Sequence, residues 1–313
     1  MAHLVEKMVR AEGTKASWHR LEDVMPEGAT LQEWQTGSGL AHTVEKTPVI
    51  YADSDGGAHL SEDKFVLYRS DTKKLLSVVG PDYNVVQPIV LFEFFADLIK
   101  HYGFIMDTAG CLAGGRRVWV LARTGNTFAV DKKNDLVKEY VLFATSYDGT
   151  LATTAKHTSV RVVCNNTLNL STRDGAGVRV VHSKAFDPAL VKLELGLMHD
   201  DWTRFKYQAS ILHDIPLGDE LANRWYAELL AEKADMSDED VAAFQTSRVL
   251  KDLMTVYKQG PGAESTLWGA VQGVTGLCDN WRGRTPDTRL NSAWFGAGAA
   301  MKKAAWDKAV LSL

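Results

Sequence analysis

The alternation of apolar and polar residues divides the chain into a part rich in strands and a part rich in helices. Between residues 64 and 182, short apolar runs alternate with clusters of Gly, Asp and Asn, which is typical of strands joined by turns. Residues 87–102 are an exception, because their apolar positions recur at helical spacing and Gly103 follows as a stop signal. After Asp187 the helical period continues almost to the end. The pattern predicts an α+β fold: an antiparallel β-meander or hairpins with packed helices, followed by a helical C-terminal part.

Turn residues predict where strands pair. The predicted hairpins join 65–68 to 75–79 through Asp71-Thr-Lys-Lys74, 104–109 to 117–123 through Gly114-Gly115, and 139–146 to 150–156 through Asp148-Gly149. Residues 178–182 are predicted to form one more strand. The segment 160–171 is ambiguous, because Val160-Arg-Val-Val163 favours a strand whereas Cys164-Asn-Asn-Thr167 is compatible with the start of a helix.

The two ends of the chain differ in regularity. Residues 1–60 contain glycines and prolines that break any long period, and a short helix is predicted only where Thr30 and Glu33 have capping-box spacing before Trp34. Helices are predicted at 188–217, 219–234, 237–257, 264–281 and 292–310. We therefore predict two regions: an α+β body with a basic β-sheet over residues 1–186, and a helical C-terminal region over residues 187–313.

Composition limits the class of protein. The 313 residues include 45% hydrophobic and 24% charged residues, with a formal net charge of −4, so any nucleic-acid binding must depend on local charge. Cys111, Cys164 and Cys278 lie far apart, which indicates reduced thiols and argues against a disulfide framework or zinc ribbon. Neither a signal peptide nor a membrane-spanning apolar run is recognisable. These features predict a cytoplasmic protein that does not enter a membrane.

Charge is concentrated in the predicted sheet. Residues 100–184 contain twelve Lys and Arg against six Asp and Glu, an excess of six positive charges, whereas 219–240 holds eight acids against Arg224 and Lys233. A basic sheet could neutralise phosphates, and aromatic residues on the same strands could stack on unpaired bases. The nucleic-acid-binding residues that we predict are Arg116, Arg117, Arg123, Lys132, Lys133, Lys156 and Arg161, and the aromatic candidates are Trp119, Tyr140, Phe143 and Tyr147. The alternative is that the charges are merely solvated and the aromatic side chains form the core.

Motifs of several enzyme classes are absent from the sequence. It has no Walker-type phosphate loop, no H-E-x-x-H, no G-x-S-x-G and no zinc-deaminase signature. Cys164, with His157 or His182 near it in sequence, resembles a nucleophile and base, but it follows Val162-Val163, the usual setting of an inert buried thiol. We therefore expect no catalytic residue, no metal site and no cofactor, and a protein that is not an enzyme.

Several motifs carry a family resemblance. Thr145-Ser-Tyr-Asp-Gly-Thr150 followed by Arg161-Val-Val-Cys-Asn-Asn-Thr-Leu168 resembles the N-S-H-D-G-S and R-V-V-C-x-N-T-L signature of a phage- and plasmid-borne family called domain of unknown function 932. Thr145 and Tyr147 replace the usual asparagine and histidine, which argues against a catalytic role for that histidine. Further family-like pieces are Ala16-Ser-Trp18-His19, Val78-Val-Gly-x-x-Tyr83-x-x-Val-Gln87, Gly114-Gly-Arg-Arg-Val-Trp119, Thr266-x-Trp268 and Phe295-Gly-x-Gly298.

The resemblance and the charge map lead to three hypotheses. The hairpin-and-helix body implied by the family is similar to that of RecT/Erf-type annealing proteins, an analogy of fold alone. The first hypothesis is therefore an ATP-independent protein of a phage or mobile element that binds single-stranded DNA, anneals strands in recombination and works as a homo-oligomer in the host cytoplasm. Its acidic segment 235–240 would meet a basic surface of the next copy. The second hypothesis is a phage protein that binds a host defence or replication factor, and the third is an enzyme built around Cys164.

Overall fold

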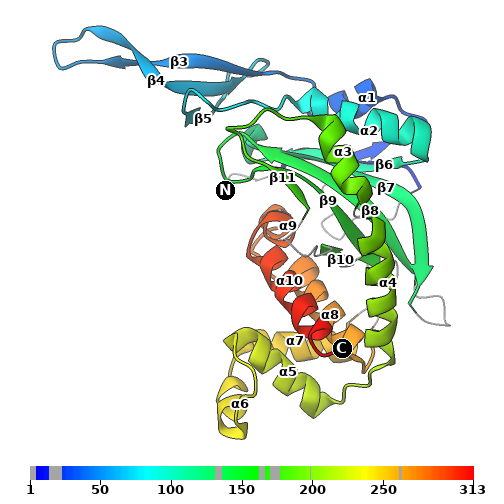
Figure 1. Cartoon of the computed structure of the whole chain (residues 1–313). Helices are drawn as coiled ribbons and strands as arrows, with labels where there is room; N and C mark the ends of the chain where they lie inside the picture. The colour runs from blue at the N-terminus through cyan, green and yellow to red at the C-terminus, as the bar shows by residue number, and fades with distance from the viewer. Residues whose placement is uncertain are drawn as a thin grey trace. The chain divides into compact units, whose positions relative to one another are not determined.

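The computed structural model describes residues 5–13, 23–130, 136–161, 166–169, 177–197, 199–260 and 263–313. It confirms the α+β class, with antiparallel strands in the first part and helices in the C-terminal part (Figure 1). Two compact units are present. Unit 1 comprises residues 1–125, 140–156 and 177–197, and unit 2 comprises residues 126–139, 157–176 and 198–313.

These units do not coincide with a single division between residues 186 and 187. Three long strands, β7 (Arg117–Ala129), β8 (Leu136–Ser146) and β9 (Thr153–Arg161), each have one part in unit 1 and the other in unit 2. The chain therefore passes between the units within strands. A boundary placed where strands give way to helices cannot reveal such interleaving, because the pattern along the chain does not show which core each end of a strand joins.

The larger sheet has the strand order β10-β9-β8-β7-β6-β1-β2, and β11 also pairs with β9. The strands not yet defined are β1 (Val5–Ala11), β2 (Asp23–Met25), β6 (Ile105–Leu112), β10 (Asn166–Asn169) and β11 (Val178–Val180). Among the pairings described, β1 with β2 is parallel, and β1–β6, β6–β7, β9–β10 and β9–β11 are antiparallel. The ambiguous segment thus contains a strand, β10, while Cys164 lies outside the described residues.

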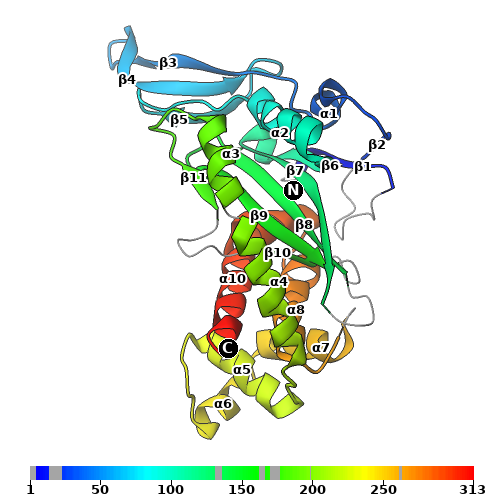
Figure 2. The same ribbon diagram turned by 45° about the vertical axis from the view of Figure 1, so that its right-hand side comes forward.

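The predicted helix–turn signals of unit 1 are confirmed. Thr30 caps α1 (Leu31–Gly37) through a capping box with Glu33, and Trp34 is buried. Helix α2 (Pro88–Tyr102) ends at Gly103, which takes the left-handed conformation that a side chain would disfavour. Helix α3 (Pro188–Leu197) lies beside α2 over the sheet, and the Lys192 ammonium lies 2.8 Å from the Asp97 carboxylate of α2 (Figures 1 and 2).

A separate three-stranded sheet forms part of unit 1. Strands β3 (Val44–Ala52), β4 (Ala58–Arg69) and β5 (Leu75–Val79) pair in that order, and the far ends of β3 and β4 project as an arm (residues 45–65) (Figure 1). The hairpin around Asp71–Lys74 is confirmed, but β1, β2 and β3 were not predicted. The reason for missing β3 is physical: most of its residues are exposed on both faces, so no alternation marks them as a strand.

Unit 2 is built mainly from helices around an aromatic core. They are α4 (His199–Asp214), α5 (Asp219–Ala231), α6 (Asp238–Phe244), α7 (Arg248–Gln259), α8 (Leu267–Gly276), a π-helical turn (Leu277–Trp281), α9 (Pro286–Phe295) and α10 (Ala297–Val310). Phe205 lies at its centre, with its ring centroid 5.3 Å from that of Trp202 and 5.0 Å from that of Trp306. The helix predicted over 237–257 is two helices, because Ser247 caps a new one at Arg248.

Candidate nucleic-acid interface

Those of the predicted basic side chains that the structure describes do not form one surface. Arg116 is exposed and Arg117 half-buried at the β6–β7 turn, and Arg123 lies six residues further along β7, about 20 Å away at the usual rise of a strand. Lys156 is buried, with 7% of its surface exposed, so it is not placed to contact a phosphate from solvent. Lys132 and Lys133 lie outside the described residues, as does the side chain of Arg161.

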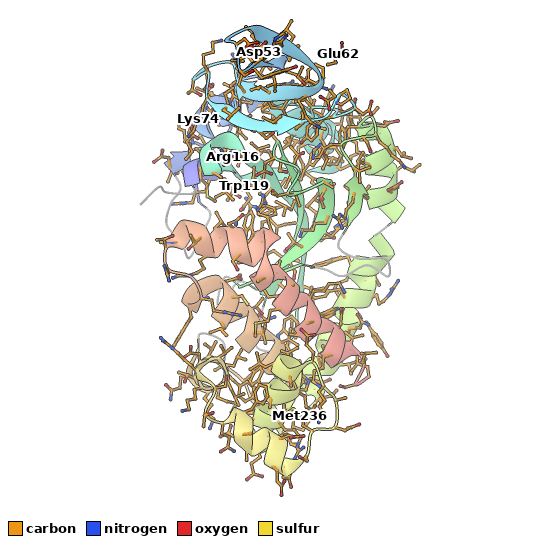
Figure 3. The ribbon with its side chains drawn as sticks, turned by 90° about the vertical axis from the view of Figure 1, so that its left-hand side faces the viewer. Asp53, Glu62, Lys74, Arg116, Trp119 and Met236 are labelled. Carbon is orange, nitrogen blue, oxygen red and sulfur yellow. The ribbon has the colours of Figure 1, made fainter. Side chains whose placement is uncertain are left out.

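A tighter group of cations surrounds the β6–β7 turn. Ala113, Gly114 and Gly115 all have positive φ, which the two glycines adopt without strain. Lys74, from the β4–β5 turn, extends over Gly114 so closely that a methyl group there would collide with its ammonium. Figure 3 shows Lys74 and Arg116 close to one another on unit 1. We call Lys73, Lys74, Arg116 and Arg117 the turn cluster; its two lysines were not among the residues predicted from sequence.

A buried arginine supports this turn from below. Arg69 has 3% of its surface exposed and lies 2.7 Å from both the Glu6 and the Asp71 carboxylates. Its side chain fills the space in front of Gly115, where a Cβ would lie 3.0 Å from Nη1. Hydrogen bonding to Arg69 holds the pKa of Asp71 well below its usual range. The positive charge of Arg69 is thus compensated within unit 1, and the exposed charge at the turn comes from the turn cluster.

Motifs far apart in the sequence meet beside the turn cluster. The Tyr83 hydroxyl donates to the Ser146 carbonyl at 2.7 Å, and the buried Tyr147 hydroxyl donates to the Val86 carbonyl at 3.0 Å. Ser77 donates to the Tyr147 carbonyl, while the Tyr147 amide donates to the Arg116 carbonyl at 2.7 Å. We call Ser77, Tyr83, Ser146 and Tyr147 the hydroxyl network. It joins the motifs at 78–87, 114–119 and 145–150 into one structure.

The Asp148-Gly149 turn is tied to Arg117. Arg117 donates to the Thr150 hydroxyl at 2.7 Å, and that hydroxyl donates to the Asp148 carboxylate at 2.6 Å. Burial raises the pKa of Asp148, but the hydrogen bonds from Thr150 and Ser146 and the charge of Arg117 together lower it further, so its pKa is lowered overall. The carboxylate is therefore an acceptor that fixes the turn and orients Arg117 through Thr150.

The aromatic residues predicted to stack on bases lie in the core. Trp119 and Phe143 have no exposed surface, Tyr147 has none, and Tyr140 has 7%. Trp119 covers Gly110, its partner across the β6–β7 pair, where a Cβ would collide with the indole ring. Phe143 packs against Phe94 of α2 at a centroid distance of 4.6 Å. The stacking prediction is wrong for these residues, because their rings are buried and not open to a base from solvent.

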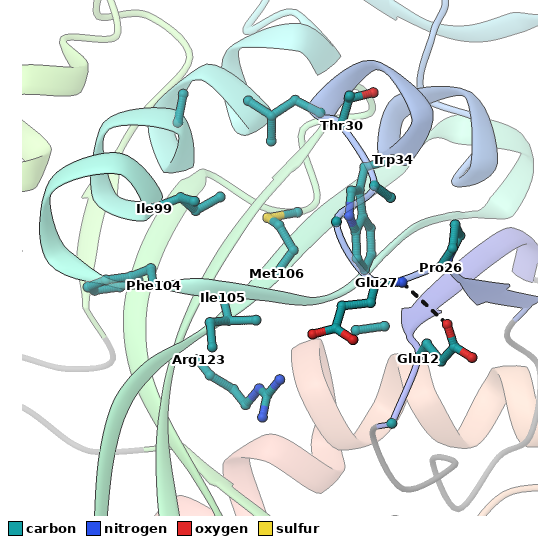
Figure 4. A pocket seen from close by; sticks show the side chains of 16 residues that line it. Glu12, Pro26, Glu27, Thr30, Trp34, Ile99, Phe104, Ile105, Met106 and Arg123 are labelled. Atoms are coloured by element: carbon teal, nitrogen blue, oxygen red, sulfur yellow. Dashed lines mark hydrogen bonds between the residues drawn. The ribbon is translucent and has the colours of Figure 1, made fainter.

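Arg123 lines a different feature, a cleft of about 650 Å³ between α1, α2 and the β6–β7 strands (Figure 4). Its walls include Trp34, Phe104 and Met106, and Glu12 and Glu27 lie at its rim. The Arg123 Nε lies 3.4 Å from the Asp107 carboxylate. Arg123 is thus separated from the turn cluster by position and has an acidic neighbour.

The cysteines, the possible metal ligands and the acidic segment 235–240 do not add a further chemical site to the residues that the structure describes. Cys111 and Cys278 are buried, and burial raises the pKa of each thiol to about 11. No cluster of three metal-binding side chains occurs among the residues that the structure describes. The acids Asp238 and Asp240 of the segment 235–240 already pair with Arg224 and Lys233 of the same chain. Within the described parts of the chain, no helix has the length and apolar character to span a membrane.

Comparison with known proteins bears on the family alone. No curated protein matches the chain, and no solved structure matches it. The model of a family described as "Domain of unknown function (DUF932)" matches residues 75–295, which include the motifs joined by the hydroxyl network. Because this match covers more than half of the 313 residues, the chain belongs to the DUF932 family.

Proposed function

We propose that the chain is a single-stranded DNA-binding protein of a phage or mobile element, which anneals complementary strands without ATP as a homo-oligomer in the host cytoplasm. The turn cluster is the observation that carries the proposal. Its exposed lysines lie on the short β4–β5 turn, and Arg116 lies on the β6–β7 turn, which contains two glycines. Arg69 and the hydroxyl network hold the backbone behind these turns. Preformed cations of this kind neutralise phosphates, which supply most of the affinity of sequence-independent binding.

Annealing also agrees with the rest of the sequence. The reaction needs neither a nucleophile nor a nucleotide-binding loop, because strand pairing is driven by the bases themselves. The protein's task is to hold a strand through its backbone and leave the bases free to pair. The turn cluster fits that task, since its exposed cationic groups can contact the phosphates of the strand.

The experiment is a gel-shift titration with a single-stranded oligonucleotide at several salt concentrations, with mass measured by light scattering. The wild-type chain is expected to bind at low salt and to exceed the monomer mass. A Lys74→Glu/Arg116→Glu variant is expected to bind at least tenfold more weakly, with a salt slope reduced by about 1.4 for two lost contacts to a single strand.

The matched control reverses two exposed lysines elsewhere, Lys100 of α2 and Lys251 of α7, to Glu. Its net charge equals that of the test variant, so a loss of DNA affinity that is specific to the turn cluster should not occur in this control. An equal loss in both variants would show that total charge, and not the turn cluster, governs binding. A wild-type chain that neither shifts DNA nor exceeds the monomer mass would overturn the annealing function.

The arm favours a second candidate, binding of a host defence or replication protein. Ile50 and Leu60 are cross-strand neighbours on the arm and are 68% and 65% exposed, and Tyr51 is 54% exposed. Exposed apolar residues grouped in this way are typical of protein-binding surfaces. The test is an Ile50→Ser/Leu60→Ser variant, assayed for DNA affinity, for mass and for support of the growth of a phage that carries it. A variant that keeps its DNA affinity and mass but no longer supports phage growth would favour this candidate over annealing.

A further inference from the structure

Tryptophan exposure singles out one loop of unit 2. The sequence has nine tryptophans, of which Trp18 lies outside the described residues. Among the eight that the structure describes, seven are at most 7% exposed, whereas Trp281 is 51% exposed. Exposing a large indole forgoes the burial that stabilises the other seven, so Trp281 is the one described tryptophan whose ring is available to a ligand.

The residues around Trp281 are cationic. Arg282, Gly283 and Arg284 follow it directly, and both arginine side chains are exposed. The segment 281–289 contains three arginines against one acid, Asp287, an excess of two positive charges. This loop connects the π-helical turn to α9. Its exposed indole offers a stacking surface, and its two exposed guanidinium groups offer phosphate ligands, all within four residues.

The loop is held in one conformation. The Arg282 amide donates to the Leu277 carbonyl at 2.9 Å, which closes the π-helical turn and places Trp281 at its end. Gly283 has a φ of +108°, which only glycine adopts readily. Arg289 of α9 donates from Nε to the Arg282 carbonyl at 3.0 Å. Arg289 thus clamps the backbone, while Arg282 and Arg284 remain on the surface.

We propose that Trp281, Arg282 and Arg284 form a stacking site for single-stranded nucleic acid, in which the indole stacks on an unpaired base and the arginines contact the flanking phosphates. This inference rests on the proposed single-stranded DNA-binding function and assigns it a second contact, in unit 2. Aromatic side chains stack on any base because every base has a π-face, so the site has no sequence requirement. Guanidinium groups stack on bases as well as pairing with phosphates, which suits them to the same strand.

The test measures fluorescence anisotropy of a labelled 30-nucleotide oligo-dT in 50 and 200 mM salt with the full chain. Trp281→Ala is expected to bind about tenfold more weakly, and Trp281→Phe, which keeps an aromatic ring, to lie within about threefold of the wild type. Arg282→Gln/Arg284→Gln is expected to reduce the salt slope by about 1.4. Oligo-dT should quench the intrinsic fluorescence of the wild type, and this quenching should disappear in Trp281→Ala.

Tyr207→Ala is the matched control, because Tyr207 is another exposed aromatic residue of unit 2, at 68% exposure on α4. The site is overturned if Trp281→Ala and Tyr207→Ala bind alike, or if Trp281→Ala weakens binding to a blunt 30-base-pair duplex as much as to oligo-dT. Wild-type binding that depends on Lys74 and Arg116 but not on Trp281 overturns this site and leaves the proposed function standing. A wild-type chain that does not bind oligo-dT overturns both the site and the proposed function.

Discussion

The motifs beside the β6–β7 turn of unit 1 are joined by neutral hydroxyl groups that donate to backbone carbonyls. The core of unit 2 instead holds an ion pair without exposed surface, unlike the Arg69 pairs of unit 1, whose carboxylates are partly exposed. In unit 1, Tyr83 and Tyr147 each reach a carbonyl more than 60 residues away in the chain. In unit 2, the Lys302 ammonium of α10 lies 2.8 Å from the Asp279 carboxylate of the π-helical turn, and neither side chain has exposed surface.

The difference has an energetic consequence. A hydroxyl–carbonyl bond contributes about 1 kcal/mol and its loss leaves one neutral acceptor without that donor. A buried ion pair contributes little net stability, but removing one partner leaves a charge in a medium of low dielectric constant. The hydroxyl network can therefore lose a member and persist, whereas the Lys302–Asp279 pair requires both partners. The π-helical turn that contains Asp279 also ends at Trp281, so the ion pair anchors the base of the proposed stacking loop.

The largest expected effect follows from breaking the ion pair. Asp279→Ala is expected to destabilise unit 2 by about 3–5 kcal/mol, because Lys302 would keep its charge in an apolar core. Asp279→Ala/Lys302→Met should recover most of this loss, since the charge is removed with its partner. The measurement is urea unfolding combined with hydrogen exchange of peptides from residues 263–313. Lys233→Ala breaks an exposed pair with Asp240 and should cost far less than Asp279→Ala, because water screens the two charges. Equal costs in Lys233→Ala and Asp279→Ala would contradict the comparison.

A smaller effect is expected from the hydroxyl network. Tyr147→Phe removes the donor to the Val86 carbonyl in a fully buried site and is expected to cost about 1–3 kcal/mol. Hydrogen exchange should rise in peptides covering 80–87 and 144–152, and stay unchanged in unit 2. Tyr51→Phe, on the exposed arm, should change stability by less than about 0.5 kcal/mol. If Tyr147→Phe lowers stability no more than Tyr51→Phe does, the Tyr147 hydroxyl is not what joins these motifs.

These residues also show what the sequence can predict. The turn at Asp148-Gly149, the capping box of Thr30 and the stop at Gly103 depend on neighbours within a few positions, so local chemistry predicts them. The Tyr147 bond to Val86, and Lys74 lying over Gly114, join segments about 40 to 60 residues apart, and no local pattern specifies such contacts.

Burial was the least predictable property of the candidate site. Lys156 and Trp119 occupy strand positions that would face solvent in a sheet with one open face, but here they are buried. Trp281 could have been suspected from sequence, because Arg282, Gly283 and Arg284 follow it and an aromatic residue next to such charges is poorly suited to a core. The sequence thus indicated local elements and the excess of charge, whereas the selection of accessible cations required the tertiary structure.

The smallest expected effect is a change of stability with pH. The hydroxyl network does not contribute to it near neutral pH, because its groups do not titrate there. His42 is 6% exposed in unit 1, and its Nδ1 lies 3.1 Å from the Gly39 carbonyl. Burial and the nearby Arg69 charge lower the pKa of His42, although Asp71 and Glu6 partly oppose this. The unfolded chain, with a histidine pKa of about 6.5, therefore binds the proton more readily than the folded chain.

The contribution of His42 to stability is thus fully present above about pH 6.5 and is lost as pH falls toward the lowered pKa of the folded state. His42→Asn, whose amide can still donate to Gly39, is expected to make the decline in stability between pH 7.5 and 5.5 shallower, with little change at pH 7.5. Unfolding midpoints at pH 7.5, 6.5 and 5.5 provide the measurement, with His101→Asn, at an exposed position of α2, as the control. A decline as steep in His42→Asn as in the wild type would assign the acid sensitivity to other groups, and would make the polar interior of unit 1 independent of pH over this range.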